Sequence, residues 1–409
     1  MANTLDVLKE RGFLSQITDE AAVRKAFDSG PVTCYIGFDP TARSFHVGNL
    51  VQIMMLAHLQ RSGHRPIALV GGGTTLIGDP SGKTELRQML TPEAIDQNIA
   101  RIKGQFSRYI SFDTGATLVN NAEWLLGLNY IDFLREVGPH FSVNRMLAAE
   151  AYKIRMETGL TFLEFNYQIL QAYDFLMLYR RYNCTMQLGG DDQWGNILAG
   201  VDLIRRMDQQ TAQALTTPLI TTADGKKMGK TAAGAIWLDP ELLSPYDYYQ
   251  FWINTDDRDV ARFLALFTFL PMEEVNRLAA LKDADIRRAK AVLAFEATKL
   301  THGDADAHKA EQAAQSVFGG GASGEANLPT TELPRTRLEG GVNIIDLFLA
   351  CGLEQSKGDV RRLITQGGAF LNETRVATIN LTVTLDHLDD NGAILLRAGK
   401  KRFHRAVAV

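Results

Sequence analysis

The segment from residue 31 to residue 73 constrains the fold of this chain more than any other. Residues 31–38, PVTCYIGF, are predicted to form a buried strand that ends at the turn formed by residues 39–41. Apolar residues then recur at helical spacing over residues 47–55, and Gly63 ends that pattern. Residues 66–73, PIALVGGG, follow as a second apolar run. A strand, a helix and a strand in this order predict a parallel βαβ unit, whose ligands bind at the carboxyl ends of the strands.

The rest of the chain divides by pattern and composition. We predict an α/β domain over residues 1–239, interrupted at about 85–165 by a mainly helical insertion. Residues 240–317 are predicted to form a helical domain, and residues 318–340, rich in glycine and proline without apolar periodicity, a linker. Residues 341–409 are predicted to form a small compact domain.

Composition excludes several classes of protein. The net charge of −4 over 409 residues gives no global nucleic-acid signature, so any RNA contact must rest on a local patch. The three cysteines lack metal-ligand or paired spacing, which favours a reducing compartment. The N-terminus does not resemble a signal peptide, and no stretch approaches the roughly 20 apolar residues that span a bilayer. We therefore expect a cytoplasmic protein without a membrane partner.

Two short motifs far apart in the sequence could handle phosphate groups. HVGN at 46–49 places His46 and Asn49 three residues apart at the expected start of a helix, where the helix field favours anions. KKMGKT at 226–231 brings Lys227 and Lys230 into a glycine-punctuated loop that could close on a pyrophosphate. In isolation, a capping histidine explains the first motif better than a phosphate contact does, and a solvated lysine turn explains the second better. No GxxxxGK[ST] pattern is present, which disfavours a P-loop NTPase.

Polar residues on one predicted helix suggest a binding cavity. Tyr167, Gln171 and Asp174 lie at i, i+4 and i+7, so they project from one face of a helix whose other positions are largely apolar. Such a stripe is either the wet side of the helix or the lining of a polar cavity.

Two turns could add polar groups to the same site. GGDDQWGN at 189–196 follows an expected strand and offers Asp192 and Gln193 to a ribose or a carboxylate, although a tight glycine turn explains it as well. GDPSGK at 78–83 adds Asp79 as a possible partner for an ammonium group. Lys83 and Arg87 follow it on a possible basic edge.

Taken together, these segments resemble the bacterial-type tyrosyl-tRNA synthetases, a family of class I aminoacyl-tRNA synthetases. The resemblance runs nearly end to end, and its motifs occur in the family's order and spacing. The motifs are YxGFDPT at 35–41, HVGN at 46–49, GDPSGK at 78–83, NYQxxQxYD at 166–174, QLGGDDQWGNI at 187–197 and KMGKT at 227–231.

The resemblance implies a fold and a reaction. The fold would be a class I Rossmann-like catalytic domain with a parallel sheet, a helical anticodon-side domain and a small C-terminal alpha-L RNA-binding domain. The enzyme would activate L-tyrosine with ATP, as the Mg²⁺ complex, and transfer it to the 3′ end of tRNA(Tyr), with no protein-bound metal. It would act as a homodimer formed through the helical insertion.

The resemblance also implies roles for the matching residues. The substrate's phenolic hydroxyl would be bound by Tyr35 and Asp174, and its ammonium group by Tyr167, Gln171 and Asp79. The carboxylate, α-phosphate and ribose would be surrounded by Asp39, Gln187, Asp192 and Gln193, with close backbone approach at Gly37, Gly48 and Gly190. The departing pyrophosphate would be bound by Thr41, His46, Asn49, Lys227, Lys230 and Thr231. Pyrophosphate or the tRNA acceptor end would be contacted by Lys83 and Arg87.

Three positions depart from the commonest pattern of the family. Asn49 replaces the second histidine of the HIGH motif, and Ile36 stands where a cysteine can supply a ribose contact. Asp191 adds a carboxylate beside Asp192 where serine is frequent, which could alter the local pKa or the affinity for magnesium. These departures bear on nucleotide affinity and leave each step of the reaction in place.

The C-terminal residues resemble an alpha-L RNA-binding motif. Lys357, Arg361 and Arg362 would lie on one helix edge, and the tail 397–405 is basic without an acidic residue. Such a patch suits contact with a phosphate backbone, although basic termini are often only solvated.

Two alternatives remain from the sequence. A tryptophanyl-tRNA synthetase shares the catalytic scaffold, but it is not expected to carry this tail or the pair Tyr35 and Asp174. The other alternative is an RNA-binding protein that keeps the fold without the activity.

Overall fold

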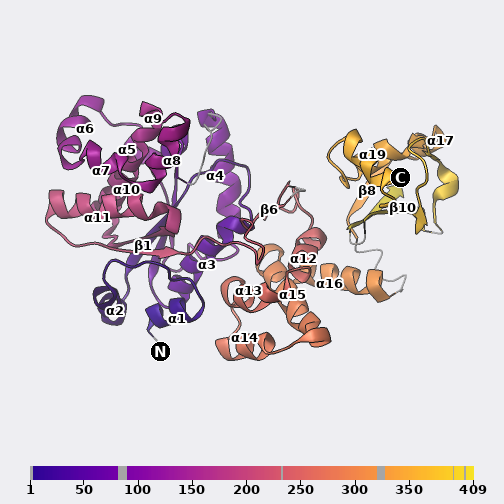
Figure 1. The fold of residues 1–409 in the computed structure, drawn as a ribbon, viewed down its shortest axis with the longest axis horizontal. Coiled ribbons are helices and arrows are strands. Elements are labelled where there is room, and N and C mark those ends of the chain that lie inside the picture. The colour runs from indigo at the N-terminus through magenta and orange to yellow at the C-terminus, as the bar shows by residue number, and fades with distance from the viewer. Residues whose placement is uncertain (1–2, 82–89, 232–233, 320–327, 390, 400–401) are drawn as a thin grey trace. The chain divides into compact units, whose positions relative to one another are not determined.

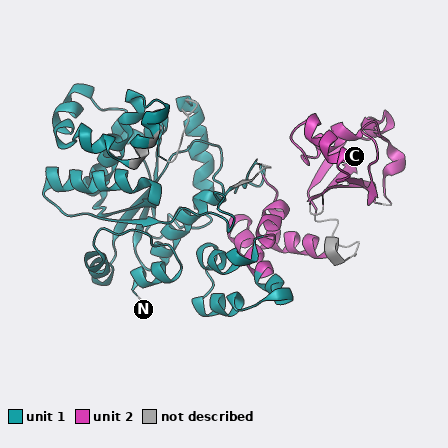
Figure 2. Cartoon of the chain, viewed as in Figure 1, with its two compact units in different colours: residues 1–242, 255–289 teal, residues 243–254, 290–409 magenta. Residues whose placement is uncertain are grey.

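The computed structural model describes residues 3–81, 90–231, 234–319, 328–389, 391–399 and 402–409. The chain forms two compact units (Figures 1 and 2). The first contains residues 1–242 and 255–289, and the second contains residues 243–254 and 290–409.

A five-stranded parallel sheet forms the centre of the first unit. Its strand order is β3-β2-β1-β4-β5, and every neighbouring pair is parallel. The strands are β1 (Thr33–Phe38), β2 (Arg65–Val70), β3 (Thr117–Asn120), β4 (Met186–Gly190) and β5 (Gln213–Thr217). The order reverses between β1 and β4, so the switch point at which such sheets bind ligands lies between the ends of these two strands. The predicted α/β class with a parallel sheet is confirmed.

Three helices follow the expected pattern around this sheet. Helix α3 (Val47–Arg61) connects β1 to β2, as the apolar periodicity predicted. Helix α10 (Tyr167–Tyr182) packs through Ala172, Phe175 and Leu176 in one core cluster with Tyr35, Ile67 and Leu69 of the strands. Helix α11 (Trp194–Asp208) packs on β4 and β5. The buried face of α10 therefore fixes the helix that carries the predicted polar stripe.

The insertion predicted at 85–165 differs from expectation in one respect. It contains β3, which is the edge strand of the main sheet beside β2. This strand is four residues long, too short to show an alternating pattern in the sequence. The other elements are helical: α4 (Pro92–Phe106), α5 (Ala122–Leu125), α6 (Tyr130–Glu136), α7 (Val143–Leu147), α8 (Glu150–Thr158) and α9 (Phe162–Phe165).

An N-terminal segment covers the other edge of the sheet. Helices α1 (Thr4–Glu10) and α2 (Glu20–Ser29) are joined by a stretch in which residues 15–18 run antiparallel to β5. Backbone hydrogen bonds join Ser15 N to Thr216 O (2.8 Å), Thr216 N to Gln16 O (2.9 Å) and Thr18 N to Ala214 O (3.1 Å). The segment thereby satisfies backbone groups that an edge strand would otherwise leave open.

The first segment of the first unit ends at Leu242, close to the predicted boundary at residue 239, but the chain returns to this unit at residues 255–289. Helices α13 (Val260–Phe267) and α14 (Met272–Ala279) belong to the first unit. The Arg11 guanidinium donates to the carbonyls of Ala265 and Thr268, and α13 packs against α3. These contacts join segments about 250 residues apart, so periodicity along the sequence does not reveal them. Helices α12 (Pro245–Ile253) and α16 (Asp304–Gly319) pack together in the second unit, and α15 (Ile286–His302) bridges the division.

The C-terminal domain is a sheet covered by short helices. Its strand order is β11-β10-β13-β14-β8, and α18 (Ile344–Ala350) and α19 (Lys357–Thr365) contribute to its buried core. The strands are β8 (Thr330–Leu333), β10 (Ala369–Leu371), β11 (Thr374–Arg375), β13 (Ala393–Ala398) and β14 (Arg402–Ala408).

Part of the range predicted as a linker, 318–340, belongs to this domain. Strand β8 pairs in parallel with β14, and Leu328, Leu333 and Leu338 are buried. The glycine- and proline-rich composition of the range concealed a strand whose partner lies about 75 residues later in the chain. Within the described residues, no helix is both long and apolar enough to cross a bilayer.

Candidate active site

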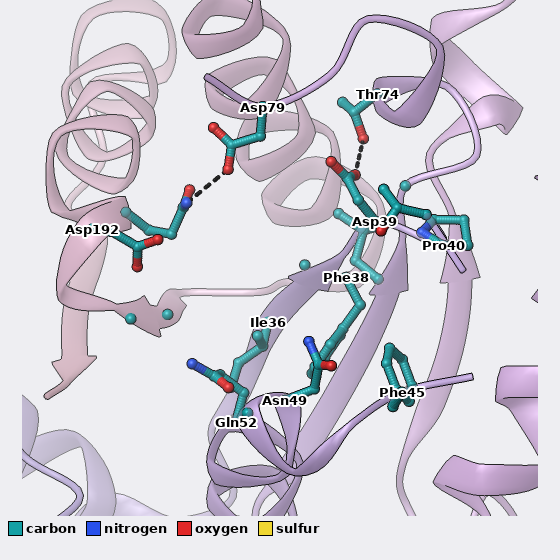
Figure 3. Close-up of a pocket in the computed structure, with 18 of the residues that line it drawn as sticks. Ile36, Phe38, Asp39, Pro40, Phe45, Asn49, Gln52, Thr74, Asp79 and Asp192 are labelled. Carbon is teal, nitrogen blue, oxygen red and sulfur yellow. Dashed lines mark hydrogen bonds between the residues drawn. The ribbon is translucent and has the colours of Figure 1, made fainter. Parts of the chain in front are cut away.

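A cavity of about 720 Å³ opens at the carboxyl ends of β1, β2 and β4 (Figure 3). It lies where the reversal of strand order predicts a ligand site. Most of the residues singled out from the sequence line it: Tyr35, Gly37, Asp39, Thr41, His46, Gly48, Asn49, Asp79, Tyr167, Gln171, Asp174, Gln187, Gly190, Asp192 and Gln193. The structure therefore brings together motifs that are up to 158 residues apart in the sequence.

Buried polar groups on β1 and α10 form one part of the cavity wall. Tyr35 is 1% exposed and Asp174 is 2% exposed. The Asp174 carboxylate accepts N–H donation from Asn121 (2.9 Å) and from the Trp124 indole (2.8 Å). Burial raises the pKa of Asp174 to about 7, against these donors, which favour the ionised form. Burial, with a smaller contribution from Asp174, also raises the pKa of the Tyr35 hydroxyl.

Two buried polar atoms of the cavity lack a protein partner. Within the part of the chain that the structure describes, neither the Tyr35 hydroxyl nor Gln187 Oε1 makes a hydrogen bond. Both residues line the cavity, and Gln187 is 2% exposed. Buried polar groups are almost always paired, so these two atoms point to a polar ligand.

The sequence did not identify Asn121 and Trp124, which hold Asp174. They follow β3, the strand that was not recognised, so nothing placed them near α10. Asn121 is 1% exposed; its side chain also donates to Thr74 Oγ1 (3.0 Å) and accepts from Gly73 N (2.8 Å). The only signal in the sequence was an asparagine and a tryptophan three residues apart. Residue type alone does not show that these two side chains are buried beside α10.

A second part of the cavity wall contains a connected set of amides and carboxylates. Gln193 Nε2 donates to Asp79 Oδ2 (2.8 Å), an interaction drawn as a dashed line in Figure 3. Asn196 Nδ2 lies within hydrogen-bond distance of the Gln193 (3.2 Å) and Gln171 (3.1 Å) side-chain oxygens and of Ser81 Oγ (3.3 Å). One NH₂ group has two hydrogens for these three acceptors. The wall is therefore rich in acceptors and suits a cationic ligand group.

The carboxylate of Asp192 faces the same space. Asp192 is exposed to the solvent of the cavity, and the nearby protein atoms, which displace part of the water around its carboxylate, together with the Asp79 carboxylate raise its pKa. A group that forms hydrogen bonds with this carboxylate would favour its ionised form.

Asp39 links Tyr167 of α10 with Thr74. Its two carboxylate oxygens accept from the Thr74 hydroxyl (2.9 Å) and from the Tyr167 hydroxyl (3.0 Å), and Figure 3 shows the first of these bonds. Thr74 in turn accepts from Asn121. A continuous chain of hydrogen bonds thus runs from Tyr167 to Asp174, which fixes the side chains along the cavity.

The HVGN motif caps α3 through its own side chains. His46 is the N-cap residue; its Nδ1 accepts from Gly48 N (3.0 Å), and Asn49 Oδ1 accepts from His46 N (3.1 Å). Because Nδ1 accepts, the hydrogen of the neutral ring is on Nε2. His46 therefore flanks the helix rather than sharing a helical face with Asn49.

The KMGKT loop packs directly against this cap. A Cβ atom on Gly229, whose φ is +92°, would lie 2.7 Å from Gly48 N and 2.9 Å from His46 Nδ1. Val47 N donates to Ile236 O (2.9 Å), and Ile236 N donates to Gly229 O (3.0 Å). The two motifs, 180 residues apart, therefore meet at the edge of the cavity, and only glycine allows this approach.

The remaining predicted residues are not among the described residues that line the cavity. Lys227 is exposed and does not line the cavity. Lys230 and Thr231 form the short strand β6 (Lys230–Thr231), and their side chains lie outside the description. Lys83 and Arg87 lie outside the described residues.

Two of the departures from the family pattern can be located. Ile36 lines the cavity and offers it no hydrogen-bonding side chain. Asp191 does not line the cavity; its carboxylate instead accepts hydrogen bonds from Ser15, Gln16 and Thr216. That Asp191 alters the local pKa or the affinity for magnesium stays a prediction.

Comparison with known proteins agrees with this site. Residues 28–319 match the family model described as class I tRNA synthetases (W and Y). The chain belongs to the class I aminoacyl-tRNA synthetases.

The remainder of the chain and its relatives narrow the assignment. Residues 323–406 match the model for the SYY-like C-terminal domain of tyrosine–tRNA ligases. The chain is 55% identical to a tyrosine–tRNA ligase from Syntrophus aciditrophicus (98% of each chain) and 54% identical to one from Clostridium botulinum (100% of each). A C-terminally truncated mitochondrial tyrosyl-tRNA synthetase from Aspergillus nidulans superposes with a TM-score of 0.70 at 30% identity, covering 78% of this chain and 95% of that one. Within its class, the chain is a member of the tyrosyl-tRNA synthetase family.

Proposed function

We propose that this chain is a tyrosine–tRNA ligase that acts in the cytoplasm, where its three free cysteines stay reduced. It converts L-tyrosine and ATP to tyrosyl-adenylate and pyrophosphate, and then transfers the tyrosyl group to the 3′ end of tRNA(Tyr). The observation that carries the proposal is the buried hydroxyl of Tyr35, unpaired within the described residues, in the same cavity as Asp174. A phenol needs one acceptor and one donor, which the Asp174 carboxylate and the Tyr35 hydroxyl supply.

The polar walls support roles for the other residues. Asp79 and Gln171 bind the substrate's ammonium group, because their oxygens belong to the wall that is rich in acceptors. Tyr167, which also lines the cavity, adds its hydroxyl oxygen. The carboxylate, the α-phosphate and the ribose are bound on the side formed by Asp39, Gln187, Asp192 and Gln193. The pyrophosphate leaves toward His46 and the KMGKT loop, beside the N-terminus of α3.

The chemistry needs positioning and charge stabilisation. A carboxylate oxygen of tyrosine attacks the α-phosphorus of ATP, a P–O bond forms, and the bond to the β-phosphate oxygen breaks with its electron pair leaving on pyrophosphate. No protein nucleophile takes part, so the protein aligns the reactants and stabilises the developing charge. His46 Nε2–H and the lysines of the KMGKT loop supply donors where that charge appears. In the second step, the ribose hydroxyl of tRNA attacks the tyrosyl carbonyl and AMP leaves.

Magnesium accompanies the nucleotide in this proposal. Among the described residues, no group of three histidine, cysteine, aspartate or glutamate side chains could hold a metal ion. Asp192 and Asp79 are carboxylates of the type that Mg²⁺ accepts as occasional ligands beside phosphate oxygens. The ion would neutralise part of the charge of the departing pyrophosphate.

The decisive experiment is pyrophosphate exchange into ATP, measured with each of the twenty amino acids. Exchange with tyrosine alone supports the proposal. Exchange with tryptophan would instead favour a tryptophanyl-tRNA synthetase. A lack of exchange with every amino acid would favour an RNA-binding protein that has kept only the fold.

The C-terminal domain is proposed to bind tRNA away from the acceptor stem. Lys357, Arg361 and Arg362 are exposed on or at the start of α19, as the sequence indicated, and Arg375 is exposed on β11. Lys357 and Arg362 form ion pairs with Asp346 and Asp359, both on the surface. Such pairs are weak and exchange readily for phosphate contacts.

Removal of residues 328–409 is expected to leave tyrosine-dependent exchange within about twofold and to lower kcat/KM for tRNA by roughly 10²-fold, the effect of losing several phosphate contacts. The cut is placed before residue 328 because a deletion from 341 would leave β8 without β14. Both activities are measured on the same preparation. An equal loss of exchange and charging would contradict a modular RNA-binding domain.

The proposal includes a homodimer formed through the helices after β3. Most large apolar side chains exposed in the described residues lie between residues 126 and 163, on or beside helices that gather together in Figure 1. They are Leu126, Tyr130, Ile131, Leu134, Val143, Met156, Phe162 and Leu163. A patch of this kind marks an interface between proteins, and a second copy of the chain is the occupant we assign to it.

Substitution of Phe162, which is 71% exposed, by aspartate is expected to weaken dimerisation by at least about 30-fold, as at an interface hot spot. Sedimentation velocity over a concentration series measures the shift. Ile379→Asp provides the control, since Ile379 is an exposed apolar residue of the C-terminal domain. A Phe162→Asp protein that sediments like the unmodified chain at every concentration would exclude this surface as the dimer interface.

A further inference from the structure

Asp191 lies at the junction between the cavity and the N-terminal segment. It begins a single 3-10 turn, η3 (Asp191–Gln193), immediately after β4. Its carboxylate accepts hydrogen bonds from the hydroxyl of Ser15 (2.6 Å), the hydroxyl of Thr216 (2.5 Å) and Nε2 of Gln16 (3.1 Å). Three donors from two separate segments thus fix one side chain, and hydrogen bonds to an ionised acceptor are the strong ones.

The donors are themselves well anchored. Thr216 is fully buried in β5, and its hydroxyl also accepts from the backbone of Gln16 (3.1 Å). Ser15 and Gln16 are held by the backbone hydrogen bonds that join the N-terminal segment to β5. Asp191 is therefore bound to the rigid edge of the sheet on one side and belongs to a turn of the cavity wall on the other.

The same turn sets the direction of the next two side chains. Successive residues of a 3-10 helix are rotated by about 120°, so a fixed Asp191 leaves Asp192 and Gln193 to face elsewhere. Both line the cavity, and Gln193 also donates to Asp79 (2.8 Å). The Asp192 carboxylate lies close over Gly190, where an added Cβ atom would be 2.6 Å from Asp192 Oδ1. Because Asp191 and Asp192 are adjacent in the same short turn, a displacement of Asp191 would move the backbone that carries Asp192.

We infer that Asp191 is a positioning residue for nucleotide binding: together with Ser15, Gln16 and Thr216 it holds the turn that presents Asp192 to ATP. The inference rests on the proposed function for the identity of the ligand. Asp191 itself does not line the cavity. The N-terminal segment thus supports the nucleotide half of the site, while the tyrosine half is held by Asn121, Trp124 and Asn196.

The test is Asp191→Ala, with two readouts. The dissociation constant of ATP, measured by calorimetry on the full chain, and the KM for ATP in exchange are each expected to rise roughly tenfold, the equivalent of one charge-assisted hydrogen bond. The dissociation constant of tyrosine should rise by a smaller factor than that of ATP, because Asn196 still holds Gln171, although Gln193 of the turn also contacts Asp79. A loss of folding alone would change both ligands together.

Conservative variants separate positioning from charge. Asp191→Asn keeps an oxygen that accepts from Thr216 or Gln16 and gains an N–H that can donate to the Ser15 oxygen, so it should recover most of the ATP affinity. Ser15→Ala should raise the dissociation constant of ATP less than Asp191→Ala does. Ser15→Ala combined with Asp191→Ala should add little to Asp191→Ala, because both changes remove the same contact.

The matched control is Thr18→Ala. Thr18 donates to Gln213 Oε1 (2.6 Å) at the opposite end of the same segment, away from the carboxyl end of β5. Its loss should lower thermal stability and leave ATP binding unchanged. ATP binding that is unaltered in Asp191→Ala, or weakened equally by Thr18→Ala, would overturn the inference. Failure of the proposed function is a different result, namely the absence of tyrosine-dependent exchange in the unmodified chain, and the calorimetric comparison still tests Asp191 in that case.

Discussion

Replacement of Lys230 by alanine is expected to slow tyrosyl-adenylate formation by roughly 10²–10³-fold while tyrosine binding stays near normal. A donor that acts on charge developing in the transition state contributes about this much. The backbone of the preceding residue, Gly229, packs against Gly48 and His46 at the N-terminus of α3, so the loop is attached where we expect pyrophosphate to leave. Single-turnover formation of the adenylate and equilibrium binding of tyrosine measure the two quantities separately.

The matched control is Lys226→Ala, in the same loop. Lys226 is exposed, and its carbonyl accepts from Thr222 N (2.8 Å) in the hairpin that leads into the motif. Lys226→Ala removes an ammonium charge, as Lys230→Ala does. It should nevertheless leave the rate of adenylate formation within about threefold, because exposed charges are screened. Single-turnover kinetics that are unchanged in Lys230→Ala, or that fall equally in both variants, would refute the assignment of the loop.

Replacement of Asp174 by alanine is expected to lower kcat/KM for tyrosine by roughly 10²-fold. The phenolic hydroxyl of the bound substrate then enters a buried site without its charged acceptor, and such an unpaired group costs about 1–3 kcal/mol or more. Asn121 and Trp124 lose their acceptor too, but they lose it with and without substrate, so that loss lowers the stability of the protein rather than its affinity.

Selectivity distinguishes this role from simple disruption of the site. Enzymes of this family discriminate against phenylalanine by about 10⁴–10⁵, a value known for the family and not obtained from this structure. Because phenylalanine lacks the hydroxyl, its kcat/KM should barely fall in Asp174→Ala. The ratio of kcat/KM for tyrosine to kcat/KM for phenylalanine should therefore fall by about the same 10²-fold. Equal losses for the two amino acids would show that the variant has damaged the cavity and that Asp174 does not bind the phenol.

Local patterns predicted the elements that form the centre of the site. The helical periodicity after residue 46 located α3, and the spacing of Tyr167, Gln171 and Asp174 placed all three on the cavity face of α10. These predictions succeed because the relevant period lies within one element and the apolar face of that element is continuous. The other site residues were predicted from the order of the motifs along the chain, which resembles that of the family.

The parts that were missed depend on partners distant in sequence. Strand β3 is too short to carry a pattern, and without it Asn121 and Trp124 could not be connected with Asp174. The hydrogen-bond partners of Asp191 were not recognised, because Ser15 and Gln16 lie about 175 residues earlier. The polarity of a residue predicts that it needs a partner, but only the fold determines which one.

The brevity of the segment after β3 has a consequence for protein engineering. Trp124, which donates to Asp174 inside the cavity, stands two residues before Leu126, which is exposed on the apolar patch. Trp124 belongs to α5 (Ala122–Leu125) and Leu126 is the C-cap of that helix, so a single turn connects the buried contact with the exposed side chain. Substitutions at Leu126, made to test the proposed dimer interface, are therefore expected to disturb the choice between tyrosine and its analogues, so each such variant must be assayed for both assembly and selectivity.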